Sequence, residues 1–71
     1  MKYLYPNLRA EMKRLGVKHK ELADSILMDR SSFSHKICGQ STFTIDEAIK
    51  IWKALKTDLP IEVLFIREYR Q

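Results

Sequence analysis

Cysteine, glycine and proline are all scarce in this sequence. The single cysteine, Cys38, cannot form an internal disulfide, so the chain does not resemble a disulfide-stapled secreted domain and fits a reducing cytoplasm. Only two glycines and two prolines are present, which leaves long stretches without a helix breaker or a turn signal. Because 45% of the residues are apolar, this composition favours a compact, mainly helical domain.

Long apolar runs are missing as well. A membrane-spanning helix needs about 18 or more apolar residues in a row, and the sequence has none. The first residues, 1–6, lack the apolar core of a signal peptide, so we expect a cytoplasmic protein. At 71 residues, the chain is expected to form one domain over 1–71, with ends at 1–4 and 67–71 that could fray.

Positive charge is concentrated in the first two thirds of the chain. The net charge is +4, and residues 1–45 hold eight Lys or Arg against four acids, whereas residues 46–71 hold five of each. From Arg30 to Ile45 there is no carboxylate, but there are six Ser or Thr. A basic stretch is often only a solvated face, although one rich in hydroxyls also suits a phosphate-bearing partner.

Apolar spacing predicts five helices, at about residues 6–15, 18–26, 30–38, 44–55 and 61–69. In the first, Leu8, Met12 and Leu15 recur on one expected core face, and Gly16 is suited to the left-handed conformation that ends a helix. The sequence shows no strand pattern and no internal repeat. The predicted fold is therefore all-α, a compact five-helix domain.

The fourth predicted helix has the strongest local signal in the chain. Thr44 and Glu47 have the spacing of a capping box, and Asp46 places a further negative charge at the same helix end. The apolar residues expected on its core face are Ile45, Ala48, Ile49, Trp52 and Leu55.

Two short helices meet across a tight turn within residues 19–37. The apolar face of the first consists of Leu22, Ala23 and Ile26. After a turn at Leu27-Met28, Asp29 is suited to N-cap the second helix, whose Phe33 and Ile37 are expected in the core. The other face of that helix presents Arg30, Ser31, Ser34, His35 and Lys36. Such a face suits an anionic partner, and duplex DNA is the commonest large one.

This helix pair resembles the helix-turn-helix of the phage repressor/Cro family (XRE-type regulators), at about residues 18–38. The likeness is carried by Glu21-Leu22-Ala23, Leu27-Met28-Asp29, Phe33 and Cys38-Gly39. It extends over roughly residues 5–66, where NLRAEM, SHKICGQSTFTIDEAIKI and LPIEVLF are similar to the Gram-positive prophage subgroup. Two positions depart from the family pattern: Leu27 replaces the usual Gly of the turn, and Lys18-His19 replaces the usual Thr-Gln.

The resemblance implies a lambda-repressor-like domain that binds double-stranded DNA sequence-specifically, with residues 30–38 in the major groove. It also implies a prophage-type transcription regulator, either Cro-like or repressor-like. The expected base-contacting residues are Arg30, Ser31, Ser34 and His35. The expected phosphate-contacting residues are Lys18, His19, Lys20, Lys36, Gln40, Ser41 and Thr42.

The last predicted helix has more apolar residues than one buried face can use. They are Ile61, Val63, Leu64, Phe65 and Ile66. Either the helix is sandwiched or part of it faces a partner, so Val63 and Ile66 are the expected interface of a homodimer, which could be weak. An alternative remains open: the same fold could be a protein-binding module, such as an antirepressor that binds another phage regulator.

Catalytic and metal-binding interpretations find no support in the sequence. His35 and Cys38 are three residues apart, but no second Cys or His pair completes a tetrahedral metal site. The same two residues as base and nucleophile would need a pocket and oxyanion donors, which a small helical bundle does not offer. We therefore expect no enzymatic activity, no metal and no cofactor.

Overall fold

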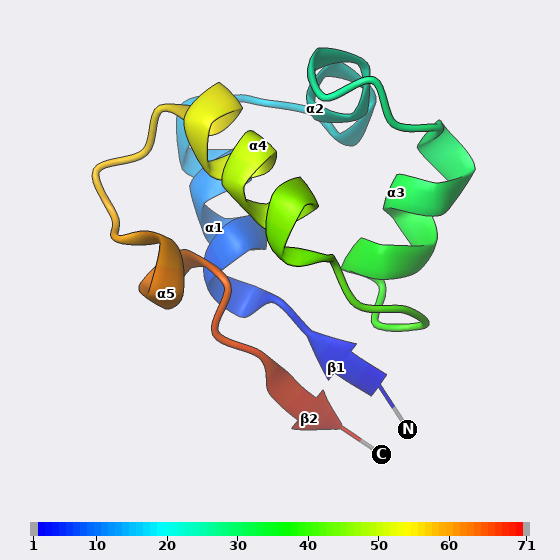
Figure 1. Ribbon diagram of the computed structural model, residues 1–71. Helices are drawn as coiled ribbons and strands as arrows, with labels where there is room; N and C mark the ends of the chain where they lie inside the picture. Colours follow the sequence, from blue (N-terminus) through cyan, green and yellow to red (C-terminus); the bar gives the residue numbers. More distant parts are fainter. Residues whose placement is uncertain (1, 71) are drawn as a thin grey trace.

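Five helices enclose one core, and two short strands pair beside it (Figure 1). The computed structural model describes the backbone of residues 2–70 and the side chains of residues 4–69. The elements are β1 (Lys2–Leu4), α1 (Pro6–Leu15), α2 (His19–Ser25), α3 (Arg30–Ile37), α4 (Ile45–Leu55), α5 (Ile61–Leu64) and β2 (Glu68–Arg70). The prediction of a compact, mainly helical five-helix domain is confirmed.

The core brings together apolar side chains from β1's end and from every helix. Its buried members are Tyr5, Leu8, Met12, Leu22, Ala23, Ile26, Phe33, Ile37, Ile51, Leu55 and Leu64. Beside the buried residues four aromatic rings form a cluster, in which Phe43 lies 5.2 Å from Tyr5, 5.6 Å from Phe33 and 5.9 Å from Phe65 between ring centroids. Tilted and edge-on aromatic pairs of this kind add to the stabilisation from burial alone.

The predicted helix ends are confirmed at three places. Gly16 ends α1 with φ +70°, and the following Val17 donates its backbone N–H to Met12 at 2.8 Å. Asp29 caps α3, because its carboxylate accepts from the backbone N–H groups of Ser31 and Ser32. At the start of α4, Thr44 and Glu47 form the reciprocal capping box.

Two residues expected in the core are instead exposed. Leu15 is 37% exposed at the last turn of α1, and Ile45 is 79% exposed at the first position of α4. Both predictions fail at helix ends, where the apolar periodicity continues but the helix has passed beyond the elements that cover it. On α4 the buried residues are Ile51 and Leu55, one turn apart, and Ile51 was not on the predicted face.

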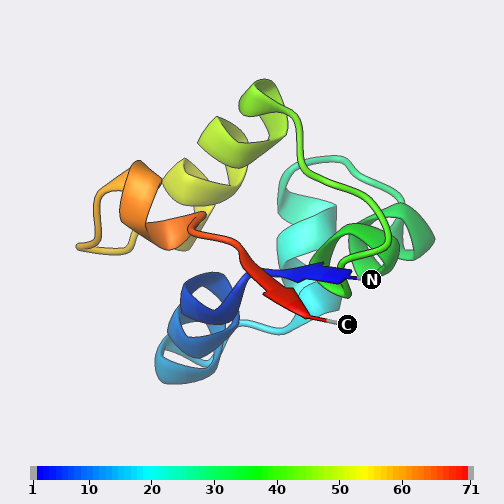
Figure 2. The same cartoon turned by 90° about the horizontal axis from the view of Figure 1, so that it is seen from below.

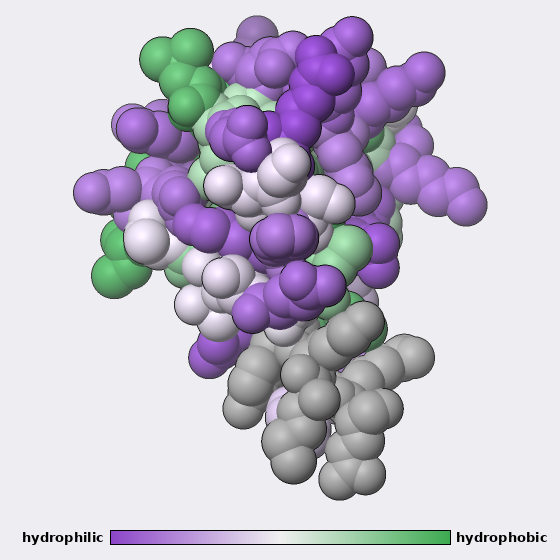
Figure 3. All heavy atoms as spheres, turned by 90° about the vertical axis from the view of Figure 1, so that its right-hand side faces the viewer, coloured by the Kyte–Doolittle hydropathy of each residue, from purple (hydrophilic) through white to green (hydrophobic). Residues whose placement is uncertain are grey.

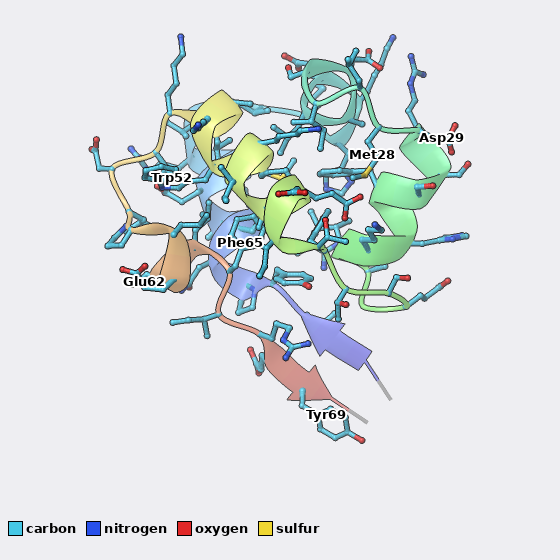
Figure 4. The ribbon with its side chains drawn as sticks, viewed as in Figure 1. Met28, Asp29, Trp52, Glu62, Phe65 and Tyr69 are labelled. Atoms are coloured by element: carbon cyan, nitrogen blue, oxygen red, sulfur yellow. The ribbon has the colours of Figure 1, made fainter. Side chains whose placement is uncertain are left out.

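The prediction of a fifth helix reaching residue 69 is wrong, because α5 ends at Leu64. Phe65 leaves the helix and packs its ring edge-on against Tyr5, at 5.9 Å and 78° (Figure 4). Asn7 also holds this segment, since its side-chain amide donates to the backbone carbonyl of Val63 at 2.8 Å. Contacts with the aromatic cluster and with α1 therefore replace the last helical turns.

Residues 2–4 and 68–70 pair as an antiparallel two-stranded ribbon rather than as loose ends. The register places Leu4 opposite Glu68 and Tyr3 opposite Tyr69, and Figure 2 shows the strands side by side. Three-residue strands are too short for an alternating pattern, so the expectation of no strand was wrong. For Met1 and Gln71, the prediction of fraying lies outside the described residues.

A buried carboxylate joins α1 to the segment after α4. Glu11 accepts hydrogen bonds from the Arg14 guanidinium, at 2.6 Å and 3.0 Å, and from the Thr57 hydroxyl. These hydrogen bonds lower the pKa of Glu11 from its ordinary value of 4.5 to about 2. The hydrogen bond from Arg14 is the largest cause, and the one from Thr57 is the next.

This lowered pKa predicts a specific loss of stability in acid. The folded state favours ionised Glu11, so its contribution to the free energy of unfolding is fully present above about pH 4.5 and is lost as the pH falls toward 2. Urea unfolding of Glu11→Gln at each pH should show a shallower pH dependence than the wild type across this range. Thr57→Val should reduce the dependence in part, and an unchanged slope in Glu11→Gln would contradict this account.

The turn between α2 and α3 contains a residue in the left-handed conformation. It is Leu27, at the position where the resembled family usually has glycine. Leu27 adopts φ +57° and is 95% exposed, whereas the next residue, Met28, packs against the core (Figure 4). A left-handed conformation costs a residue with a Cβ roughly 1–2 kcal/mol. Leu27 offers little burial to offset that cost.

We therefore expect Leu27→Gly to stabilise the fold. Relief of strain of about 1 kcal/mol would raise the melting temperature by about 4–8 °C in a domain of this size. Gly16→Ala is the matched control: it places a Cβ at φ +70° in open space, so it should lower the melting temperature through backbone strain alone. A clear destabilisation of Leu27→Gly in thermal unfolding would show that the exposed leucine makes an important contact.

Candidate nucleic-acid interface

The orientation of α3 is fixed by the turn before it and by its buried side chains. Backbone N–H groups of Leu27 and Met28 donate to the carbonyls of Asp24 and Ala23, at 3.2 and 2.9 Å, and close the turn. Phe33 and Ile37 are fully buried, as predicted, so the opposite side of α3 must face outward. Ala23 of α2 is also fully buried, and α2 and α3 pack against each other.

Four predicted base-contacting residues lie on the outward side of α3. Arg30, Ser31, Ser34 and His35 are all exposed, and their spacing of one and four residues places them on one helix face. Figure 3 views the molecule from the side of α3, where the surface is largely hydrophilic. The structure thus brings these four residues together, with cationic and hydroxyl groups directed to solvent.

Arg30 has one close acidic neighbour. Its guanidinium lies 4.0 Å from the carboxylate of Asp24, at the limit of an ion pair, and both side chains are about 60% exposed. Exposed pairs of this kind contribute little, about 0–1 kcal/mol. Arg30 therefore remains available to a stronger anion or to a base edge.

A second group of predicted residues lies at the start of α2. Lys18, His19 and Lys20 are exposed, and the His19 ring lies 5.7 Å from the buried Phe33 ring. Partial burial is the main cause that lowers the pKa of His19, and the positive charge of Arg9 is the second. His19 is therefore mainly neutral at pH 7, and it would serve a phosphate as a hydrogen-bond donor rather than as a cation.

The pKa of His19 also reveals a residue that sequence reasoning missed. Arg9 belongs to α1, ten residues before His19, yet its exposed guanidinium acts on His19 through charge. Arg9 therefore adds positive charge near His19. Its position in the fourth residue of α1, outside the helix pair, gave no signal in the sequence.

Residues of the loop after α3 form the third group. Gln40, Ser41 and Thr42 are exposed, and the loop follows Gly39, which has φ +90°. The backbone N–H of Phe43 donates to the Tyr5 hydroxyl at 3.2 Å. The exposed polar loop is thereby fixed to the aromatic cluster at its end.

Lys36 differs from the other predicted contacts because its charge is already paired. Its ammonium lies 2.6 and 2.8 Å from the two carboxylate oxygens of Glu47, and its side chain is mostly buried. Burial alone would raise the pKa of Glu47, but hydrogen bonds from Lys36 and Thr44 lower it below the ordinary value. Lys36 therefore joins α3 to the start of α4.

Comparison with protein-family models, with curated proteins and with solved structures finds no match to this chain. The resemblance to phage repressors therefore remains an expectation from the sequence. Within residues 2–70, His, Cys, Asp and Glu side chains form no group of three or more with the arrangement of metal ligands. Among the same residues, no helix has the length and apolarity required to cross a bilayer.

Proposed function

We propose that the protein binds double-stranded DNA through a lambda-repressor-like helix-turn-helix, in which α3 enters the major groove. The observation that carries this proposal is the outward face of α3, where Arg30, Ser31, Ser34 and His35 project together from a helix anchored by Phe33. The sequence from residue 30 to residue 45 contains no carboxylate to repel phosphate. The function proposed is that of a small, phage-type transcription regulator.

Readout of bases would begin at the start of α3. The major groove admits an α-helix, and an arginine there can donate two hydrogen bonds to guanine, which contributes about 1–3 kcal/mol of discrimination. Arg30 is the first residue of α3 and is suited to this contact. Ser34 and His35 are one turn further along and would reach the neighbouring base pairs.

Phosphate contacts would flank α3 on two sides. Arg9, Lys18 and Lys20 supply exposed positive charge from α1 and α2, and the loop residues 40–42 supply hydroxyl and amide groups. In this proposal Lys36 has a structural role instead, because its ion pair with Glu47 holds the loop-bearing end of α3 against α4.

Arg30 and Lys18 should respond differently to substitution, because one is proposed to read bases and the other to bind backbone. Arg30→Ala should cost about 1–3 kcal/mol on a preferred duplex and much less on a scrambled one. Lys18→Ala should weaken binding to both duplexes alike and reduce the slope of log affinity against log salt by about 1. Fluorescence polarisation across a salt series, after selection of a preferred duplex from a random pool, measures both effects.

Lys36→Met is the matched control for these substitutions. It should lower the melting temperature, because Glu47 loses its partner. For the folded variant, the slope of log DNA affinity against log salt should stay as in the wild type. Equal losses on both duplexes for Arg30→Ala would assign Arg30 to phosphate. Failure of the wild type to select any duplex would favour the alternative, a protein-binding module such as an antirepressor.

Binding to two half-sites would require a homodimer, and the structure leaves part of the predicted interface accessible. Ile66 is 50% exposed just after α5, whereas Val63 is half-buried and its carbonyl accepts from Asn7. Ile66 is therefore the better placed of the two predicted interface residues.

We expect a weak, concentration-dependent dimer that Ile66→Asp disrupts, because a carboxylate would be desolvated in an apolar contact. Analytical ultracentrifugation at increasing protein concentration measures the dissociation constant. Leu15→Asp places the same charge at an exposed apolar site on α1 and should leave the association unchanged. A strictly monomeric wild type at several hundred micromolar would exclude this interface.

A further inference from the structure

A second surface lies where the end of α2 meets the outer side of α4. An open hollow of about 290 Å³ is lined there by Ser25, Ile26, Leu27, Lys50 and Lys53, which we call the Leu27 surface. None of these residues belongs to α3 or to the loop after it. The Leu27 surface is therefore separate from the proposed DNA-reading residues.

Leu27 has no role in the fold that would account for its identity. Its side chain is 95% exposed, and its backbone adopts φ +57°, where glycine or asparagine is less strained. Its neighbours on either side, Ile26 and Met28, are the residues that contact the core. Backbone strain of this kind is often retained at functional sites.

The other half of the Leu27 surface is positively charged. Lys50 and Lys53 are exposed and three residues apart, so they share one face of α4. Within the described residues, neither makes an ion pair or a side-chain hydrogen bond. Among the described residues that line the hollow, none carries a negative charge.

We propose that the Leu27 surface docks an acidic segment of a protein partner. An apolar side chain of that segment enters the hollow beside Ile26 and Leu27, and its carboxylates pair with Lys50 and Lys53. The hollow is slightly smaller than typical ligand pockets, so it suits one or two side chains rather than a complete small molecule. A contact this small belongs to weak, transient association.

DNA is a poorer occupant of the Leu27 surface than an acidic protein. Both would satisfy the two lysines, but a phosphate backbone offers no apolar group to Leu27. Charge complementarity together with an apolar contact is characteristic of a protein partner. Because the surface and α3 share no residue, the inference does not require that the DNA-binding proposal be correct.

The test uses a defined peptide and the ¹⁵N-labelled protein. The probe is a synthetic helical peptide with leucines one turn apart, flanked by glutamates; matched peptides carry Gln for each Glu or Ser for each Leu. We expect amide shifts at residues 25–27 and 50–53 with a dissociation constant below about 1 mM, and at least a tenfold weaker binding of each matched peptide.

Variants of the protein then separate the apolar and charged contributions. Leu27→Gly should weaken peptide binding at least tenfold although it relieves backbone strain, and Lys50→Gln with Lys53→Gln should remove the salt dependence of binding. Leu15→Ser, at another exposed apolar site, should bind the peptide as the wild type does. Affinity of Leu27→Gly for duplex DNA, measured separately, should stay within twofold of the wild type.

Three outcomes would overturn the proposal. The first is no shift at these residues with 1 mM peptide, and the second is unchanged peptide affinity in Leu27→Gly. The third is a DNA duplex that displaces the peptide, shifts the same amide signals and binds less tightly to the Lys50→Gln, Lys53→Gln variant. That result would assign the surface to DNA. Failure of the α3 proposal would instead appear as an unchanged affinity of Arg30→Ala for its preferred duplex. That substitution leaves the Leu27 surface intact.

Discussion

The aromatic cluster around Phe43 is the interaction on which the arrangement of the other elements depends. Tyr5 lies between β1 and α1, Phe33 belongs to α3, Phe43 to the loop before α4, and Phe65 to the segment after α5. Four parts of the chain that are distant in sequence are thereby held by one set of ring contacts. Removing a buried aromatic ring typically costs about 3–5 kcal/mol, a large part of the stability of a domain this small.

Sequence reasoning succeeded where a structural signal is local. The glycine that ends α1, the Asp29 cap and the capping box of α4 each depend on residues within four positions of one another. The side chains of α3 that face outward were also predictable, because the buried Phe33 and Ile37 fix the opposite face. Leu27 has a positive φ at the position where the family that this helix pair resembles usually has glycine.

What the sequence did not reveal depends on contacts between distant segments. The ribbon of β1 and β2 pairs Leu4 with Glu68, which are 64 residues apart, and neither strand is long enough to show alternation. The end of α5 is decided by the contact of Phe65 with Tyr5, and the pairing of Lys36 with Glu47 links two helices. Helical periodicity alone also overstated the burial of Ile45, since it cannot show where neighbouring elements end.

The position of the single tryptophan gives the protein an intrinsic optical reporter. Trp52 is half-buried on α4, its indole N–H donates to the carbonyl of Leu59 at 2.8 Å, and Figure 4 shows it on the side of α4 away from α3. Its emission therefore follows the detachment of the α4–α5 connection from the core. A ligand bound along α3 would leave that emission nearly constant, so unlabelled protein can be followed through unfolding while the ligand is present.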